Sequence, residues 1–146
     1  RSLGRYFFDD QAFDTSTKDV PNTILMRGTQ LAGVRERFGR GQAGTSVLVD
    51  PLRAQAAELL TFAPPSVCDK SRNVLGGNKN DYVSLAKDWW PVTETDRSAA
   101  YEKRDGCANP ERFAEHFDYS RLAQMSDAAL KLALAAYLTK DKALGL

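Results

Sequence analysis

The segment at residues 76–110, GGNKNDYVSLAKDWWPVTETDRSAAYEKRDGCANP, most constrains how this 146-residue chain can fold. It shows neither helical nor strand periodicity, yet it is rich in tyrosine and tryptophan. Irregular segments longer than about 12–15 residues are uncommon in compact domains, and they are usually functional loops or disordered linkers. Disordered segments are poor in aromatic residues. We therefore predict an ordered loop that lines a binding cleft.

The overall composition is that of an ordinary globular chain, for which the prior is a single domain. The formal net charge is +1, and Lys and Arg are balanced by Asp and Glu, which disfavours a dedicated nucleic-acid binder. No apolar run approaches the ~20 residues of a membrane span, so we expect no membrane partner. Rossmann, P-loop and zinc signatures are absent. The chain begins at Arg1 and has no signal-peptide pattern, so it looks processed or excised.

The N-terminal part predicts a leader and a first helix. Residues 1–20 carry an aromatic cluster among aspartates, which indicates either an extended leader that pins its rings to a neighbouring surface or a partly ordered terminus. Asn22 or Thr23 is the predicted cap of a helix that ends at Gly39. Its apolar positions recur at helical spacing: Leu25, Leu31, Val34 and Phe38.

A second helix is predicted over residues 47–63, or from Pro51 with Asp50 as its cap. Pro64 and Pro65 end it, because proline lacks the amide and clashes with the preceding turn. Its predicted buried stripe consists of Leu52, Ala56, Leu59, Leu60 and Ala63.

The C-terminal part predicts a short helix that opens at Asn109 and Pro110, followed by a long helix over residues 119–139 with Asp118 or Ser120 as its cap. Apolar residues nearly encircle the long helix, which predicts burial on more than one side. Three helices cannot readily cover such a helix, so we expect the chain to be a fragment of a larger helical domain. The apolar positions are Leu122, Met125, Ala128, Ala129, Leu130, Leu132, Ala133, Leu134, Ala136, Tyr137 and Leu138.

Two segments, SVCDKSRNVLGGNKNDYVSLAKDWWP at residues 66–91 and YEKRDGCANPE at residues 101–111, resemble the alginate lyase family of polysaccharide lyases. Most positions of the family pattern match in order and spacing. The resemblance implies an all-α fold, a partial α/α toroid of helical hairpins with a long irregular loop. In that arrangement residues 1–146 are the N-terminal part of the domain: a leader (1–20), a helical hairpin (21–64), a cleft or lid loop (65–117) and a helix (118–146).

The family resemblance also implies an activity, the β-elimination of a 1,4-linked uronate polymer. An Arg or Asn neutralises the carboxylate next to the weakly acidic C5 proton, while His and Tyr commonly remove that proton and protonate the leaving O4. The family's catalytic residues are expected downstream of Leu146, and no cofactor or metal is implied. The implied partner is an acidic polysaccharide. We expect the protein to be secreted or periplasmic and to be a monomer.

The resemblance carries over six candidate substrate-binding residues from the irregular segment. Lys79 either pairs with a uronate carboxylate or is an ordinary surface lysine. Tyr82 either donates to a sugar or is a core residue with a satisfied hydroxyl. Trp89 and Trp90 point different ways, so one can stack on a sugar while the other anchors the loop, or both are anchors. Arg104 and Asn109 complete the set.

The last two candidates have favoured structural interpretations. Arg104 starts an Arg-Asp-Gly turn and is expected to pair with Asp105 or another carboxylate. Asn109 precedes proline and is a helix cap more often than a ligand. His116 suits general-base chemistry, but it lies outside the matched motif, so a catalytic role is disfavoured.

Cys68 and Cys107 lie in the two halves of the motif and allow two alternatives. They form a disulfide across the loop if the protein is exported, or they are buried free thiols in a reducing cell.

Two departures from the family pattern keep a second function open. Residues 78–82 read Asn-Lys-Asn-Asp-Tyr where the family usually has Asp-Lys-His-Asp-Tyr, and the segment before Tyr101 lacks a Gly-Leu-Pro. The chain is therefore either part of a lyase or a non-catalytic, carbohydrate-binding homologue. A purely structural helical domain would explain the helices but not the chemistry of the loop.

Overall fold

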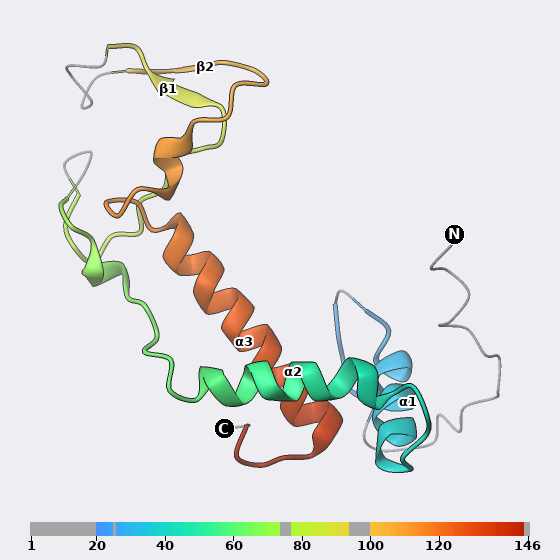
Figure 1. Cartoon of the computed structure of the whole chain (residues 1–146). Coiled ribbons are helices and arrows are strands. Elements are labelled where there is room, and N and C mark those ends of the chain that lie inside the picture. The colour runs from blue at the N-terminus through green and yellow to red at the C-terminus, as the bar shows by residue number, and fades with distance from the viewer. Residues whose placement is uncertain (1–19, 25, 74–76, 94–99, 145–146) are drawn as a thin grey trace. The chain divides into compact units, whose positions relative to one another are not determined.

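The computed structural model describes residues 20–24, 26–73, 77–93 and 100–144 (Figure 1). The chain divides into two compact units, one formed by residues 1–60 and 131–146 and the other by residues 61–130. The predicted leader, apart from Val20, and the predicted apolar position Leu25 lie outside the described residues. No helix in the described ranges has the length and apolar character needed to span a bilayer.

Helix α1 (Gly28–Gly39) begins later than predicted and ends at the predicted glycine. The prediction that Asn22 or Thr23 caps the helix is wrong, because the Thr23 hydroxyl donates instead to the Met26 carbonyl and the residue before the helix is Arg27. A Cβ atom on Gly28 would lie 1.9 Å from the Pro21 carbonyl oxygen. The chain therefore passes so close to itself at the helix start that only glycine fits there.

Helix α2 (Ser46–Leu59) begins one residue before the first predicted start and ends before the predicted end. Pro51 lies inside the helix and does not begin it. The helix buries Val49 and Ala56, and Ala56 contributes to a core with Ala135 and Leu144. Leu52, Leu132 and Ala136 pack against this core. The predicted burial of Leu60 and Ala63 is wrong, because both residues follow the end of the helix and are exposed.

Helix α3 (Tyr119–Thr139) has the predicted bounds. It buries Ala128, Ala135 and Leu138. Leu122, Met125 and Leu130 are exposed, so the expectation of burial on more than one side is not met over the N-terminal half of the helix within the described chain.

The described residues between α2 and α3 form two 3₁₀ turns and a hairpin. The turn η2 (Val67–Asp69) has a capping box, in which Ser66 Oγ accepts from the Cys68 amide (3.1 Å) and Asp69 Oδ2 accepts from the Ser66 amide (2.8 Å). The turn η3 (Pro110–Phe113) is the short helix that the sequence predicts.

Strands β1 (Trp89–Pro91) and β2 (Tyr101–Lys103) pair in antiparallel register, with Trp90 opposite Glu102 (Figure 1). The all-α prediction therefore needs correction: the regular structure is predominantly helical but includes this small sheet. Each strand has only three residues, too few to show a period-2 pattern, and β1 ends in proline, which argues against a strand in a sequence.

Candidate functional site

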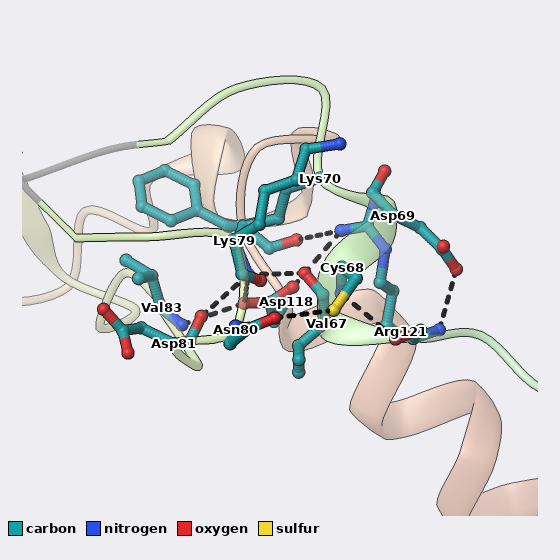
Figure 2. Close-up of polar contacts among 12 residues, drawn as sticks. Val67, Cys68, Asp69, Lys70, Lys79, Asn80, Asp81, Val83, Asp118 and Arg121 are labelled. Carbon is teal, nitrogen blue, oxygen red and sulfur yellow. Dashed lines mark hydrogen bonds and ion pairs between the residues drawn. The ribbon is translucent and has the colours of Figure 1, made fainter.

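A buried lysine lies at the centre of the irregular region (Figure 2). The Lys70 side chain is 0% exposed, and its ammonium contacts four oxygen atoms. These are the carbonyls of Val67 (2.5 Å), Lys79 (3.0 Å) and Asp81 (2.7 Å), and Asp118 Oδ2 (3.0 Å). An ammonium has three donors and no acceptor, so it suits a cage made only of oxygens. Lys70 thereby joins η2, the loop around residues 79–81 and the residue that precedes α3.

Asp118 is the counter-ion in this cage, and its side chain is 1% exposed. Its Oδ2 atom also accepts from the Val83 amide (2.9 Å), while the Asp118 amide donates to the Val83 carbonyl (2.8 Å). Arg121 lies beside Asp118 Oδ1 (3.5 Å) and donates to the Asp69 carbonyl (3.0 Å). The sequence predicts Asp118 or Ser120 as the cap of the long helix. In the structure the Asp118 carboxylate bonds to the buried lysine and the Val83 amide.

Residues 78–82 form a turn next to this cage, and side chains of the turn bond to its own backbone. Asn78 Oδ1 accepts from the Asn80 amide (2.7 Å), and Asp81 Oδ2 accepts from the Asn78 amide (2.9 Å). Asn80 Oδ1 accepts a hydrogen bond from the Cys68 thiol (3.1 Å). Lys79 is exposed at the top of this turn, and Tyr82, 47% exposed, follows it. Both candidate binding residues are therefore accessible on a fixed backbone.

The adjacent tryptophans of β1 have different environments. Trp89 is 41% exposed, whereas Trp90 is half-buried and its indole N–H donates to the Cys107 carbonyl (2.8 Å). Successive side chains of a strand point to opposite faces. Trp90 therefore anchors the loop through this bond, whereas the ring of Trp89 is the more exposed of the two.

Arg104 lies over the ring of Trp90, with 5.5 Å between the guanidinium carbon and the ring centroid. It pairs with Glu102 through Nε (2.7 Å) and Nη2 (2.6 Å), while Asp105 pairs with Lys103. The expected ion pair is present, with Glu102 as the carboxylate. Arg104 therefore acts as part of the hairpin in this structure.

Asn109 is 2% exposed and joins the hairpin to η3. Its Nδ2 donates to the Trp89 carbonyl (2.9 Å), and its Oδ1 accepts from the Glu111 amide (3.0 Å). The prediction that Asn109 caps a short helix is confirmed. Asn109 is buried, and both the oxygen and the nitrogen of its side-chain amide are bonded. It therefore holds the backbone of Trp89 in place.

The six predicted binding residues thus fall into two groups. Lys79 and Tyr82 belong to the turn, and the other four belong to the hairpin: Trp89, Trp90, Arg104 and Asn109. Within the described ranges no hydrogen bond, ion pair or ring contact joins the two groups.

The sequence profile of the alginate lyase family matches residues 66–145, more than half of the chain. The chain belongs to the alginate lyase family. Its structure is similar to the crystal structure of an alginate lyase from Bacteroides ovatus, with a TM-score of 0.64 and 33% sequence identity. The similarity covers 78% of this chain and 29% of that protein, so the chain spans less than a third of the length of this relative. No curated protein matches the chain at a significant level.

The segment matched to the alginate lyase family includes two residues of the site that the sequence did not indicate. They are Lys70 and Asp118, which the sequence indicated only as a candidate helix cap. Lys70 lies in the SVCDK part of the motif, yet nothing in a linear sequence distinguishes a buried lysine from a surface one. The signal that could have indicated Lys70 was the family motif, in which this lysine precedes the Asn-Lys-Asn-Asp-Tyr turn at a matching spacing. Asp118 lies 48 residues from Lys70, so only the fold brings their charges together.

His116 contacts the side chains of Glu111 and Phe117. Its Nε2 lies 3.4 Å from Glu111 Oε1, and the two side chains are 13% and 16% exposed. Its ring also packs on Phe117, with 4.6 Å between the centroids. The histidine thus contacts η3 and its neighbour in the chain, Phe117, which precedes α3.

The two cysteines are free thiols in the structure, and both are exposed. The sequence left open a disulfide or two buried thiols, and the structure contains neither. The thiol of Cys68 instead bonds to Asn80. Among the residues that the structure describes, no group of three or more His, Cys, Asp or Glu side chains is arranged to hold a metal ion.

Proposed function

We propose that the protein is a polysaccharide lyase that cleaves a uronate-containing polymer such as alginate by β-elimination. It would act outside the cytoplasm, secreted or periplasmic, in a domain of the incomplete α/α toroid type. Membership of the alginate lyase family supports the reaction class, and the similarity to the Bacteroides ovatus enzyme supports the helical architecture.

The observation that carries this proposal is the contrast between exposed ligand-type side chains and the buried groups beneath them. Lys79, Tyr82 and Trp89 are exposed, whereas Lys70 and Asn109, which donate to the backbone carbonyls of Lys79 and Trp89, are buried. Binding groups on loops need such support, because a site is only as well positioned as the residues that hold it.

Each exposed group suits one feature of a polyuronate. The Lys79 ammonium is a point charge for a uronate carboxylate. The Tyr82 hydroxyl can donate to a ring or hydroxyl oxygen, and the Trp89 indole offers an apolar face to a sugar ring. These residues bind and orient the polymer. We assign the transfer of the C5 proton and the protonation of O4 to none of them.

The experiment is turnover of a panel of polymers by the intact protein. Alginate, polygalacturonate and a glucuronate polymer are each mixed with it, and the ultraviolet absorbance of the unsaturated uronate product is followed. A neutral glucan, which has no carboxylate to make the C5 proton acidic, is the control. We expect absorbance to rise with at least one polyuronate; no rise with any of them would refute lyase activity.

A second function, saccharide binding without turnover, is favoured by one observation. Asn78 and Asn80 replace an acid and an imidazole of the family pattern, and both asparagines are used to shape the turn. This alternative predicts retention on a polyuronate column, weakened by Trp89→Ala, with no unsaturated product. Product formation in the same sample would exclude it.

A further inference from the structure

The turn that carries Lys79 and Tyr82 has two separate kinds of support. Its internal shape comes from its own asparagine and aspartate side chains, through the bonds of Asn78 Oδ1 and Asp81 Oδ2 to backbone amides. Its attachment to the rest of the unit comes from Lys70, which holds the carbonyls of Lys79 and Asp81, and from the bonds of Asn80 to Cys68 and of Val83 to Asp118. Loss of Lys70 would therefore weaken the attachment of the turn but leave its internal bonds in place.

The Lys70 side chain occupies the place that a small cation would take in an oxygen cage. Three neutral carbonyls and one carboxylate surround a compact positive charge, and the closest contacts are 2.5 and 2.7 Å. Charge-assisted bonds of this kind are shorter and stronger than neutral ones. Without the ammonium, the three carbonyls would lose this donor and the buried Asp118 carboxylate would lose its lysine counter-ion, although it would keep the Val83 amide, and these losses are costly.

Lys70 does not touch a bound polymer, because its side chain and that of Asp118 are 0% and 1% exposed. It acts through the residues it holds. The carbonyl of Lys79 is one of its ligands, while the Lys79 side chain is exposed. Asp118 holds the other side of the turn by accepting from the Val83 amide, one residue after Tyr82.

We propose that Lys70, together with Asp118, is the positioning residue of the saccharide-binding turn: it fixes where Lys79 and Tyr82 meet an acidic polysaccharide. This inference rests on the proposed function, because it assigns a partner for the turn. It predicts that Lys70 affects substrate affinity, and that its effect passes through Lys79.

The test is a double-mutant cycle on the intact protein, with Lys70→Met, Lys79→Ala and the double variant. Lys70→Met keeps an unbranched side chain of similar length and removes the charge. We expect KM for the polyuronate to rise about tenfold in Lys70→Met, with a much smaller change in kcat. Because Lys79 would already be misplaced, Lys79→Ala should change KM far less in that background than in the wild type. Independent, multiplying effects would overturn the proposal.

Two variants keep this test sound. Lys103→Met removes an exposed lysine of the same unit, paired with Asp105, and should leave KM unchanged. If Lys70→Met does not fold, Asp118→Asn replaces it: the amide keeps the shape of the carboxylate but removes the charge that faces Lys70. The same cycle with Lys79→Ala is then measured, and the same outcomes decide.

A second measurement does not depend on activity. Hydrogen exchange of the Val83 amide, which bonds to Asp118, should be about tenfold faster in Lys70→Met. The Val49 amide of α2, in the other unit, should be unaffected. If the wild-type protein neither cleaves nor binds any polyuronate, the proposed function alone is refuted. If hydrogen exchange at Val83 is unchanged in Lys70→Met, the positioning role of Lys70 is refuted.

Discussion

In the unit formed by residues 1–60 and 131–146, the core consists of Ala56, Ala135 and Leu144, all small or aliphatic. In the unit formed by residues 61–130, the most buried large side chains are instead Lys70, Asn109 and Asp118. The difference follows from the backbone. Helices satisfy their own amides and carbonyls, so their contacts can be apolar. Loops do not, so buried loop carbonyls require side-chain donors.

This comparison teaches where the molecule should be sensitive to each kind of substitution. A change of charge should matter most in the unit of loops, and a change of volume should matter most between the helices. The exposed saccharide-binding candidates lie in the unit of loops, residues 61–130. The same polar groups therefore affect both the stability of these loops and the affinity for a ligand.

The largest effect is expected for Asp118→Ala. It leaves the Lys70 charge buried without its counter-ion and the Val83 amide without its acceptor. Removing one partner of a buried ion pair costs about 3–5 kcal/mol. Urea unfolding should show this loss. The control is Asp105→Ala, which removes an 80% exposed carboxylate paired with Lys103 and should cost less than about 1 kcal/mol. Equal losses would mean that burial of the pair has no energetic role.

In the helical unit, Ala135→Leu should be the sensitive change of volume. Ala135 is 0% exposed and lies in the core with Ala56. Overpacking a filled core costs about 1–3 kcal/mol. Ala133→Leu places the same side chain on an exposed position of the same helix and should be nearly neutral. Thermal or urea unfolding distinguishes the two, and a comparable loss in both variants would show that this core is not tightly packed.

The helices could be predicted from sequence because their signals are local. Apolar spacing placed α3 at residues 119–139, and the Asn-Pro pair placed η3. The start of α1 could not be predicted, because it depends on the approach of Pro21 to Gly28 in space. The pair of three-residue strands was missed because neither is long enough to show a pattern.

The sequence indicated the exposed candidates and one buried residue. The family motif indicated Lys79, Tyr82 and Trp89, which are exposed, and Asn109, which is buried and caps η3 as predicted. The buried cage around Lys70 was not predictable, because the partners of Lys70 lie up to 48 residues away. A lysine among polar residues is normally a surface residue. Only the fold shows that its charge is enclosed.

Asn109 tests the polar support of the hairpin. Asn109→Ala removes both the bond donated to the Trp89 carbonyl and the bond accepted from the Glu111 amide. The free energy of unfolding should therefore fall by about 1–2 kcal/mol. Asn109→Asp keeps the acceptor and loses the donor, so it should recover part of the loss. If aspartate is no better than alanine in urea unfolding, the cap bond to Glu111 contributes nothing.

The smallest effect on stability, and the sharpest test of the division between support and surface, is expected for Trp89→Ala. Trp89 is 41% exposed, while Trp90 is half-buried and bonds to the Cys107 carbonyl. Trp89→Ala should lower the unfolding free energy by less than Trp90→Ala does, because its ring is more exposed, yet weaken retention on a polyuronate column. Trp90→Ala should cost about 1 kcal/mol or more, because it removes the hydrogen bond to the Cys107 carbonyl and the half-buried ring that Arg104 lies over. Measuring stability and saccharide affinity for both variants separates the roles, since an indole that binds without supporting the fold moves only affinity. The reverse result, a destabilised Trp89→Ala with intact affinity, would place Trp89 among the supports and leave the hairpin without an aromatic contact for sugar.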